Sequence, residues 1–257
     1  MSENEYWTEA KSKFNESDLS VFKTWNSVRS VPLYSESQYE NYYAGDIIQI
    51  TNMMSENDRK VVYSVLREPF IGHTTESYNR ARRILPVNGE QLETTAWSIK
   101  SLHHALVYAA TTGKRFSDYD QIVEFGAGIG DTCRVIYELG YTGPYYIYDL
   151  PEVLRISTFY NPFAKGVTHY SEVPNDKKTL FIGTWSISEV PPDYRTEVFT
   201  HFKDADYLLI YQNKAFEYDN KDYFENVFPN IITGKLQTFD IPWLSDIAGG
   251  NKYLITT

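Results

Sequence analysis

The sequence predicts an α/β fold in which a doubly wound, mostly parallel seven-stranded sheet carries a helical N-terminal extension. Three observations lead to this prediction. From about Gln121 onward, short runs of β-branched and aromatic residues alternate with amphipathic stretches, as in βαβ units. A glycine-rich turn follows the first of these runs, between Phe125 and Asp131. Residues 1–90 lack this alternation and are polar and aromatic, with scattered proline and glycine.

The expected strands are short apolar runs bounded by turn residues. They cover Gln121–Phe125, Tyr145–Asp149, Gly166–Tyr170, Thr179–Thr184, Tyr207–Tyr211, Leu236–Ile241 and Tyr253–Thr256. Helical stretches separate the early strands, so we expect crossover connections between parallel neighbours.

The expected crossover helices cover Asp131–Leu139, Pro151–Tyr160, Pro192–Phe202 and Lys221–Val227. Two of them begin at a proline, which is favoured in the first helical turn because its missing N–H would have no partner there. Gly140 follows the first helix as a natural stop, since glycine readily adopts the left-handed conformation of a helix end.

A longer helix is expected upstream, over Leu92–Thr112. Its apolar residues recur at spacings of three and four, which places them on one helical face: Ile99, Leu102, Leu106 and Ala109. This helix would pack on the sheet and connect it to the preceding segment.

The N-terminal segment shows only hints of helix, at Asp18–Trp25 and Glu56–Leu66. We therefore divide the chain into a helical or irregular cap over residues 1–90 and an α/β domain over residues 91–257. The choice of substrate is expected to depend on the cap.

Composition excludes several classes of protein. The 257 residues include 24 Lys and Arg against 34 Asp and Glu, a net charge of −10, which argues against nucleic acid or an anionic membrane as a partner. The single Cys133 excludes an internal disulfide and a four-thiolate zinc site. No apolar run approaches the ~20 residues of a membrane span, and residues 1–25 are too polar for a signal peptide. We expect a cytoplasmic protein.

The most specific local feature is the glycine loop, which reads Glu124-Phe125-Gly126-Ala127-Gly128-Ile129-Gly130-Asp131. A phosphate-binding P-loop would need Gly-Lys-Ser/Thr, but Asp131 follows Gly130. A dinucleotide fingerprint would need its third glycine at position 131, where the carboxylate would instead repel a pyrophosphate. A cofactor without phosphate remains, beside the simpler alternative of a structural turn.

This loop resembles the E-x-G-x-G-x-G pattern of Rossmann-like methyltransferases that use S-adenosylmethionine. The resemblance implies a Rossmann-like fold and this cofactor, with the strand-end acid and the loop holding its methionyl end. It also implies that Asp149 binds the ribose hydroxyls, since a carboxylate can accept two hydrogen bonds from a vicinal diol. The implied cofactor-binding residues are Glu124, Phe125, Gly126, Ala127, Gly128, Gly130, Asp149, Leu150, Thr184 and Trp185.

Three further stretches resemble a narrower group, the sugar O-methyltransferases. Asp149–Leu154 reads Asp-Leu-Pro-Glu-Val-Leu as in that group, and Ser186–Pro191 is similar to its Ser-x-Ser-Glu-Met-Pro turn. The Tyr-x-x-Asn-Arg ending of an aromatic strand becomes Tyr211-Gln-Asn-Lys214 here, so a bidentate donor is lost. The resemblance covers roughly residues 100–257 and implies an acceptor that is a sugar or a nucleotide sugar.

Methyl transfer to a hydroxyl needs a group that takes up the proton. Glu189, in the turn after the fourth expected strand, is the first candidate, His103 is the second, and His104 is the third. On a helical wheel His103 falls within the apolar arc, where a core histidine is the simpler interpretation, whereas His104 lies about 100° further round and is expected at the surface. No spacing of acids or histidines predicts a metal site.

The sequence thus predicts an S-adenosylmethionine-dependent O-methyltransferase that acts on a sugar hydroxyl. Two alternatives stay open: a methyltransferase for another small acceptor, and a catalytically silent protein of the same fold that serves as a binding subunit. A nicotinamide-dependent oxidoreductase is a third alternative, which the glycine spacing disfavours.

Overall fold

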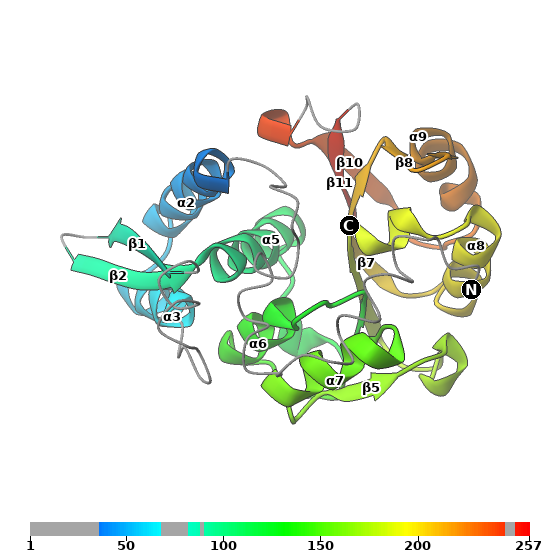
Figure 1. The fold of residues 1–257 in the computed structure, drawn as a ribbon, viewed down its shortest axis with the longest axis horizontal. Coiled ribbons are helices and arrows are strands. Elements are labelled where there is room, and N and C mark those ends of the chain that lie inside the picture. The colour runs from blue at the N-terminus through cyan, green and yellow to red at the C-terminus, as the bar shows by residue number, and fades with distance from the viewer. Residues whose placement is uncertain (1–35, 68–81, 88–89, 245–249) are drawn as a thin grey trace.

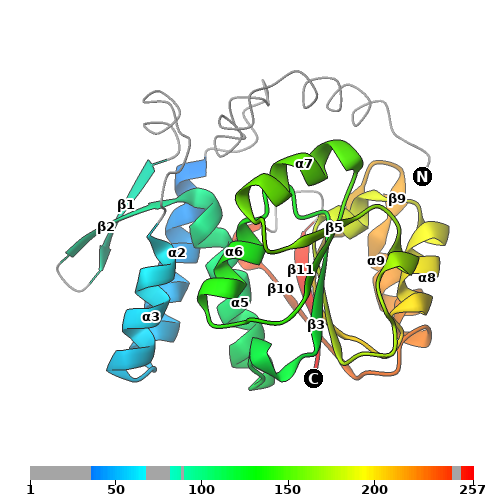
Figure 2. The same cartoon turned by 90° about the horizontal axis from the view of Figure 1, so that it is seen from below.

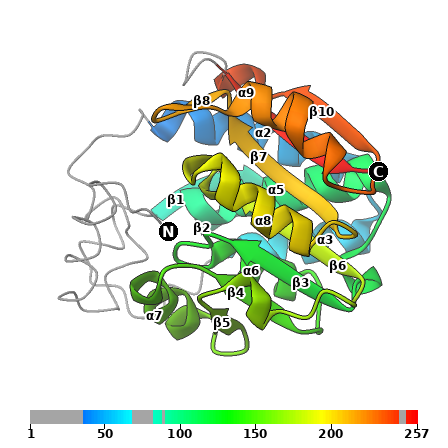
Figure 3. The ribbon, with the colours of Figure 1, turned by 90° about the vertical axis from the view of Figure 1, so that its right-hand side faces the viewer.

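The computed structural model describes residues 36–67, 82–87, 90–244 and 250–257. Within these ranges a seven-stranded sheet has the order β10-β11-β7-β6-β3-β4-β5 (Figure 3). Its strands are β3 (Gln121–Phe125), β4 (Tyr145–Tyr148), β5 (Lys165–Val167), β6 (Thr179–Thr184), β7 (Asp206–Gln212), β10 (Leu236–Asp240) and β11 (Asn251–Thr256). β11 is antiparallel to both of its neighbours, and the other strand pairs are parallel.

Helices cover both faces of this sheet. Figure 2 shows α5 (Ala96–Thr112) and α6 (Asp131–Glu138) on one side, and α8 (Pro192–His201) and α9 (Asn220–Asp222) on the other. Successive strand residues point to opposite faces, so Ile122 packs in the core beneath α5 and α6 while Val123 packs in the core beneath α8. The predicted doubly wound, mostly parallel sheet is confirmed.

The strand order reverses next to β3. The chain moves outward from β3 to β4 and β5, and then returns to place β6 on the other side of β3. In open α/β sheets ligands bind beyond the carboxyl ends of the strands at such a switch point. The glycine loop follows β3 and the 3₁₀ helix η4 (Ser186–Glu189) follows β6, so both candidate segments lie at this point.

The helix predicted over Leu92–Thr112 begins later than expected. Glu90–Thr95 forms β2, which pairs antiparallel with β1 (Arg82–Val87), and α5 starts at Ala96. The Thr95 side chain accepts a hydrogen bond from the Ser98 backbone N–H and caps the helix. The apolar spacing identified the helical face, but it could not distinguish its first turn from the preceding strand.

Two further elements differ from expectation. The third strand, predicted to reach Tyr170, ends at Val167 because the Glu172 carboxylate binds the backbone N–H groups of Thr168 and His169. These side-chain bonds replace the sheet ladder and start the 3₁₀ helix η3 (Tyr170–Glu172). The helix predicted over Lys221–Val227 is α9, continued by a π-helix over Tyr223–Val227.

The remaining elements are short, apart from α7 (Pro151–Tyr160), which packs beside β4 and β5. They are the 3₁₀ helices η2 (Phe116–Asp118), η6 (Phe228–Asn230) and η7 (Pro242–Leu244), and the strand pair β8 (Lys214–Ala215) and β9 (Tyr218–Asp219). None of the helices in the described ranges combines the length and the apolar composition that crossing a bilayer demands.

The N-terminal region adds two helices, α2 (Glu36–Asn52) and α3 (Glu56–Leu66), on the outer side of α5 (Figure 1). The predicted helix at Glu56–Leu66 is confirmed, whereas Asp18–Trp25 lies outside the described residues. The predicted boundary at residue 90 falls at the start of β2, within the β1–β2 pair. Ile47 and Leu66 belong to the same hydrophobic core as Leu102 of α5, so these helices and the α/β body share one core.

Candidate active site

The three glycines of the loop have left-handed backbones, with φ of +70°, +59° and +83° at Gly126, Gly128 and Gly130. A Cβ on Gly126 would lie 2.1 Å from Ser186 Cβ, and one on Gly130 would lie 2.3 Å from Asn161 Nδ2. A Cβ on Gly128 would meet nothing within 4 Å. Two glycines are therefore required for packing within the protein, and Gly128 is the one that borders open space.

Glu124 ends β3 as a buried carboxyl group. It accepts a hydrogen bond of 2.7 Å from the Tyr145 hydroxyl. Burial raises the pKa of Glu124 to about 7, against the lowering effect of hydrogen bonds from Tyr145 and Thr132, and the negative charges of Asp149 and Asp131 raise it further. The loop is therefore rich in carboxyl groups that share a low-dielectric environment.

Asp149 follows β4 and faces the glycine loop. Its Oδ2 accepts a hydrogen bond of 3.2 Å from the Gly128 N–H, and its Oδ1 accepts one of 2.8 Å from the Leu150 N–H. Burial raises the pKa of Asp149 to about 7, and these two hydrogen bonds oppose the rise. The carboxylate thus lies beside Gly128, the glycine that borders open space.

The loop after β6 joins the glycine loop across the switch point. Ser186 Oγ donates a hydrogen bond of 3.0 Å to the Gly126 carbonyl. The preceding Trp185 has φ of +68°, a rare and strained backbone for a bulky residue. Its N–H donates to the Ile210 carbonyl at 2.7 Å and its indole Nε1 to Asn251 Oδ1 at 2.7 Å, and these bonds hold the strained conformation in place.

Other predicted residues border this site in different ways. Thr184 is the last residue of β6, and Leu150 is the residue just before α7. Both are partly buried. The Phe125 side chain is buried against Tyr148, with ring centroids 5.0 Å apart, so it faces the core beneath α8. Ala127 packs on the opposite core, beneath α5 and α6.

Glu189 ends η4 and is partly buried. The carbonyls on either side of it are held by Arg195, whose Nη2 donates to the Ser188 carbonyl and whose Nε donates to the Val190 carbonyl, both at 2.7 Å. The third contact of this fully buried guanidinium is Asn220 Oδ1 at 2.6 Å, and burial lowers the Arg195 pKa to about 10. Sequence reasoning missed Arg195, because nothing local in an amphipathic helix marks it as buried.

His103 and His104 are both buried, each with 1% of its surface exposed. The core position predicted for His103 is confirmed, and the surface position predicted for His104 is wrong. His104 is buried because α2 packs over the side of α5 that carries it and places Tyr43 edge-on against both histidine rings. Both histidines bind the Tyr253 hydroxyl through Nδ1, and His103 Nε2 contacts Asp46 Oδ2 at 3.2 Å.

Trp185 connects this histidine pair to the glycine loop. The His104 ring packs edge-on against the Trp185 indole, with centroids 5.5 Å apart. Lys100 lies over the same indole, with Nζ 4.9 Å from its centroid, and over Trp97 at 4.2 Å. One turn of α5 thus presents a cation and a histidine to the residue at the switch point.

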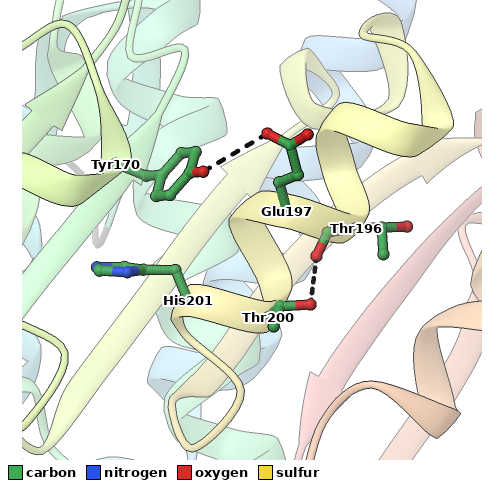
Figure 4. Close-up of a pocket in the computed structure, with 5 residues that line it drawn as sticks. All are labelled: Tyr170, Thr196, Glu197, Thr200 and His201. Carbon is green, nitrogen blue, oxygen red and sulfur yellow. Dashed lines mark hydrogen bonds between the residues drawn. The ribbon is translucent and has the colours of Figure 1, made fainter.

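The other described histidines, His169 and His201, lie away from this pair, and both rings pack against Tyr170. A shallow hollow of about 390 Å³ is lined by Tyr170, Thr196, Glu197, Thr200 and His201. Figure 4 shows these five side chains. These residues belong to η3 and the last turns of α8, whereas the glycine loop adjoins the segment that precedes α8. The hollow is therefore separate from the candidate site. The fifth histidine, His73, lies outside the described residues. Within the described ranges no three His, Cys, Asp or Glu side chains converge as metal ligands would.

No protein-family model and no curated protein matches this sequence. Among solved structures, the chain is similar to a Thermoplasma acidophilum protein designated 1320, at 13% identity and a TM-score of 0.46, over 62% of this chain and 87% of that one. It is also similar to PigF with S-adenosylhomocysteine, at 11% identity and a TM-score of 0.42, over 63% and 58% of the two chains.

A third similar structure is the magnesium protoporphyrin IX methyltransferase of Synechocystis PCC 6803 with bound S-adenosylmethionine. The identity is 12% and the TM-score 0.45, over 62% of this chain and 83% of that one. At these identities and TM-scores, the function has to be argued from the site itself.

Proposed function

We propose that this protein is an S-adenosylmethionine-dependent O-methyltransferase whose acceptor is the hydroxyl group of a sugar or nucleotide sugar. The observation that carries the proposal is the pairing of Gly128 with Asp149 at the switch point: an open backbone position beside a carboxylate. Such a pair suits a ligand that approaches the backbone closely and offers hydroxyl donors.

The donor set fits this cofactor better than a phosphate-bearing one. S-adenosylmethionine is cationic at its methionyl end and carries a ribose diol. Glu124 supplies a buried carboxyl group at the loop, which attracts a cation and repels a pyrophosphate, and Asp149 supplies a carboxyl group for the diol. The nearby Arg134 is engaged by Glu138 at 2.7 Å, by Ser98 Oγ at 2.7 Å and by the Val65 carbonyl at 3.1 Å. Its Nε also lies 3.6 Å from Asp131 Oδ1, so its charge is paired with carboxylates of the protein itself.

The bound cofactor would supply an electrophilic methyl group. The chain's own contribution is to hold the reactants in line, because alignment of the two reacting atoms accounts for much of the rate of a direct displacement. Gly126, Gly128 and Gly130 let the loop turn and admit the ligand, and Asp149 orients the ribose. Trp185 and Glu189 border the acceptor side, since both follow β6 at the switch point.

Residues 1–90 are proposed to cap the acceptor side of the cleft. Support comes from α2, which contributes Tyr43 and Asp46 to the cluster behind Trp185. The sugar specificity rests on the resemblance of Asp149–Leu154 and Ser186–Pro191 to the sugar O-methyltransferases. A cytoplasmic location is proposed from the charge and the single, buried, free Cys133.

Calorimetry with S-adenosylmethionine, S-adenosylhomocysteine and NAD in parallel tests the cofactor. We expect binding of the first two and none of NAD. Transfer of a labelled methyl group to a panel of monosaccharides and nucleoside diphosphate sugars then tests the acceptor, with phenols, amines and carboxylates as the comparison set. Binding of NAD alone would contradict the proposal, and cofactor binding with no methyl transfer to any acceptor would favour a silent binding subunit.

A further inference from the structure

Four side chains form a continuous hydrogen-bonded chain behind Trp185. Asp46 Oδ2 lies 3.2 Å from His103 Nε2, and His103 Nδ1 lies 3.0 Å from the Tyr253 hydroxyl. The same hydroxyl lies 2.5 Å from His104 Nδ1. His104 Nε2 is buried and has no hydrogen-bond partner among the described residues. Buried polar atoms are almost always paired, so an unpaired buried imidazole nitrogen requires an explanation.

The positions of the protons follow from the hydrogen-bonding capacity of each group. A carboxylate only accepts, so His103 Nε2 must carry a hydrogen toward Asp46. Neutral His103 then has a bare Nδ1, which accepts the hydrogen of the Tyr253 hydroxyl. That hydroxyl has no second hydrogen, so His104 Nδ1 must donate to it. The result is a neutral His104 whose Nε2 carries a free lone pair.

The electrostatics of the cluster agree with two neutral histidines. Burial lowers the His103 pKa, although the hydrogen bond and the charge of Asp46 oppose the shift. Burial lowers the His104 pKa well below its usual value, and the charges of His103 and Lys100 add to the effect. Of the groups around the pair, Asp46 on α2 stabilises positive charge on His103, whereas Lys100 on α5 disfavours it on His104.

We propose that His104 is the catalytic residue that takes up the proton of the acceptor hydroxyl, and that Asp46, His103 and Tyr253 are positioning residues that fix its tautomer. This inference rests on the proposed methyl transfer and names its proton acceptor. The position supports it, because the His104 ring contacts Trp185 at the switch point. In the preceding turn, Ser101 Oγ lies 3.3 Å from Thr132 Oγ1, which donates to it from the first turn of α6.

The proton transfer balances without any further reagent. The acceptor oxygen keeps the electron pair of its O–H bond and forms the new O–C bond, while the C–S bonding pair stays on sulfur. The released proton binds His104 Nε2. The Nδ1 proton of His104 can then move to Tyr253 as the Tyr253 proton moves to His103, which leaves the positive charge on His103, beside Asp46 and farther from Lys100.

This arrangement narrows the class of acceptor. A base is needed when the acceptor oxygen carries a proton at neutral pH, as a sugar or other alcohol does, and not when it is an ionised carboxylate. The arrangement also distinguishes His104 from the other two candidates for the base, His103 and Glu189. Both nitrogens of His103 are engaged, and Glu189 lies on η4 rather than in this chain.

Long-range ¹H–¹⁵N NMR of the imidazoles in the full chain tests the proton assignment without any substrate. We expect a hydrogen on Nε2 of His103 and on Nδ1 of His104, with both rings neutral at pH 7.5. In Tyr253→Phe, His104 loses its Nδ1 partner and should revert to the Nε2–H tautomer. A wild-type His104 that carries its hydrogen on Nε2, or a positive charge, would overturn the proposal.

Turnover and binding provide the second measurement. With the panel sugar that wild type methylates fastest, His104→Asn should lower kcat by roughly 10²–10⁴-fold, the usual range for a positioned base. Its calorimetric affinity for S-adenosylhomocysteine should stay within a few-fold of wild type. His201→Asn, which changes a histidine in the separate hollow, should leave both unchanged. If Glu189→Gln lowers kcat by this factor and His104→Asn does not, the role belongs to Glu189.

The two proposals fail in different ways. If wild type binds neither S-adenosylmethionine nor S-adenosylhomocysteine, the proposed function is wrong whatever the tautomers. If it binds and methylates while His104→Asn turns over normally, only the assignment of the base is wrong. If circular dichroism shows that His104→Asn folds poorly, Tyr253→Phe provides the test, because it keeps the aromatic ring. Its His104 tautomer and its kcat are then both measured. An unchanged tautomer or an unchanged kcat would contradict the proposed role of the hydrogen-bonded chain.

Discussion

Glu124 and Asp149 show how burial changes the chemistry of single residues in this protein. Both carboxyl groups have pKa values raised to about 7, chiefly because their surroundings stabilise the ionised form poorly. A bound cation or a set of hydroxyl donors would compensate for that loss of solvation. A ligand of this kind would therefore favour the ionised form of both carboxyl groups. Raised pKa values of this kind are common at functional sites.

Ligand affinity should consequently depend on pH. An ionised Asp149 accepts hydrogen bonds from a diol with both oxygens, so below pH 7 binding requires loss of a proton. The affinity for S-adenosylhomocysteine should fall as the pH decreases below 7, by up to about tenfold per pH unit, and level off above it. Calorimetry between pH 5.5 and 8.5 measures this, and Asp149→Asn should bind more weakly with a flatter profile. An unchanged slope in Asp149→Asn would assign the dependence to Glu124.

Gly128 and Gly113 provide a matched pair of glycines. Each has a left-handed backbone, with φ of +59° and +67°, and a Cβ on either would meet nothing within 4 Å. Gly113 ends α5, away from the loop. Valine at either position should cost about 1–2 kcal/mol of backbone strain. Only Gly128→Val should abolish binding of S-adenosylhomocysteine, because its side chain would occupy the open space. Equal loss of binding in both variants would mean that strain alone is responsible.

At the scale of elements, η4 depends on α8 for its shape. Arg195 contributes from α8 the hydrogen bonds that hold the carbonyls of Ser188 and Val190, and the aromatic rings of Tyr223 and Phe224 lie 5.2 and 5.7 Å from its guanidinium carbon. The Arg195 guanidinium binds neutral carbonyls and not a carboxylate, so its positive charge is not neutralised by these partners and lies close to η4. We infer that this contact sets the position of Glu189.

Arg195→Met should therefore destabilise the protein and disturb η4. The substitution removes the donor of the buried Ser188 carbonyl, of the partly buried Val190 carbonyl and of Asn220 Oδ1, at about 1–3 kcal/mol for each group left buried and unsatisfied. Chemical denaturation should show a loss of at least about 2 kcal/mol, with Arg195→Lys intermediate. Arg155→Met, on the exposed face of α7, is the control and should change stability by less than about 0.5 kcal/mol. An equally small loss of stability in Arg195→Met and Arg155→Met would show that the hydrogen bonds of Arg195 contribute little to the stability of the protein.

At the scale of the whole molecule, the N-terminal helices and the α/β body share one hydrophobic core. Tyr43 and Ile47 of α2 and Leu66 of α3 are buried in the same cluster as Ile182 and Ile210 of the sheet. Asp46 of α2 also ends the hydrogen-bonded chain through His103. The predicted cap is thus joined to the body by packing as well as by position, and we expect removal of residues 1–90 to destabilise the remainder.

Leu66→Ala tests this coupling without truncation. Leu66 is fully buried, so the variant should lose about 2–5 kcal/mol of unfolding free energy. Because the core is shared, the transitions followed by tryptophan fluorescence and by far-UV circular dichroism should move together. Val61→Ala, on the same helix with 47% of its surface exposed, should have an effect below about 0.5 kcal/mol. Separate transitions in Leu66→Ala would mean that α2 and α3 unfold independently of the sheet.

The sequence by itself determined most of the sheet and the glycine loop. The strands from Gln121 to Phe125 and from Thr179 to Thr184 appear where predicted, because a fully buried strand needs a short apolar run and a turn at each end. The loop was recognisable for the same reason, since its left-handed backbone at Gly126, Gly128 and Gly130 favours glycine. Each of these requirements concerns residues that are close together in the sequence, so a short sequence pattern is enough to predict the element.

Only the tertiary structure decided which side chains meet. His104 was predicted at the surface because a helical wheel shows the helix alone, whereas α2 covers that flank and Tyr253 reaches it from a strand near the end of the chain. The contacts of Arg195 with η4 and of Trp185 with Asn251 likewise join segments that have no shared local pattern. Hydrogen bonds between distant segments form only once the sheet order has brought them together. The folded molecule was therefore needed to favour His104 over Glu189 and His103 as the proposed proton acceptor.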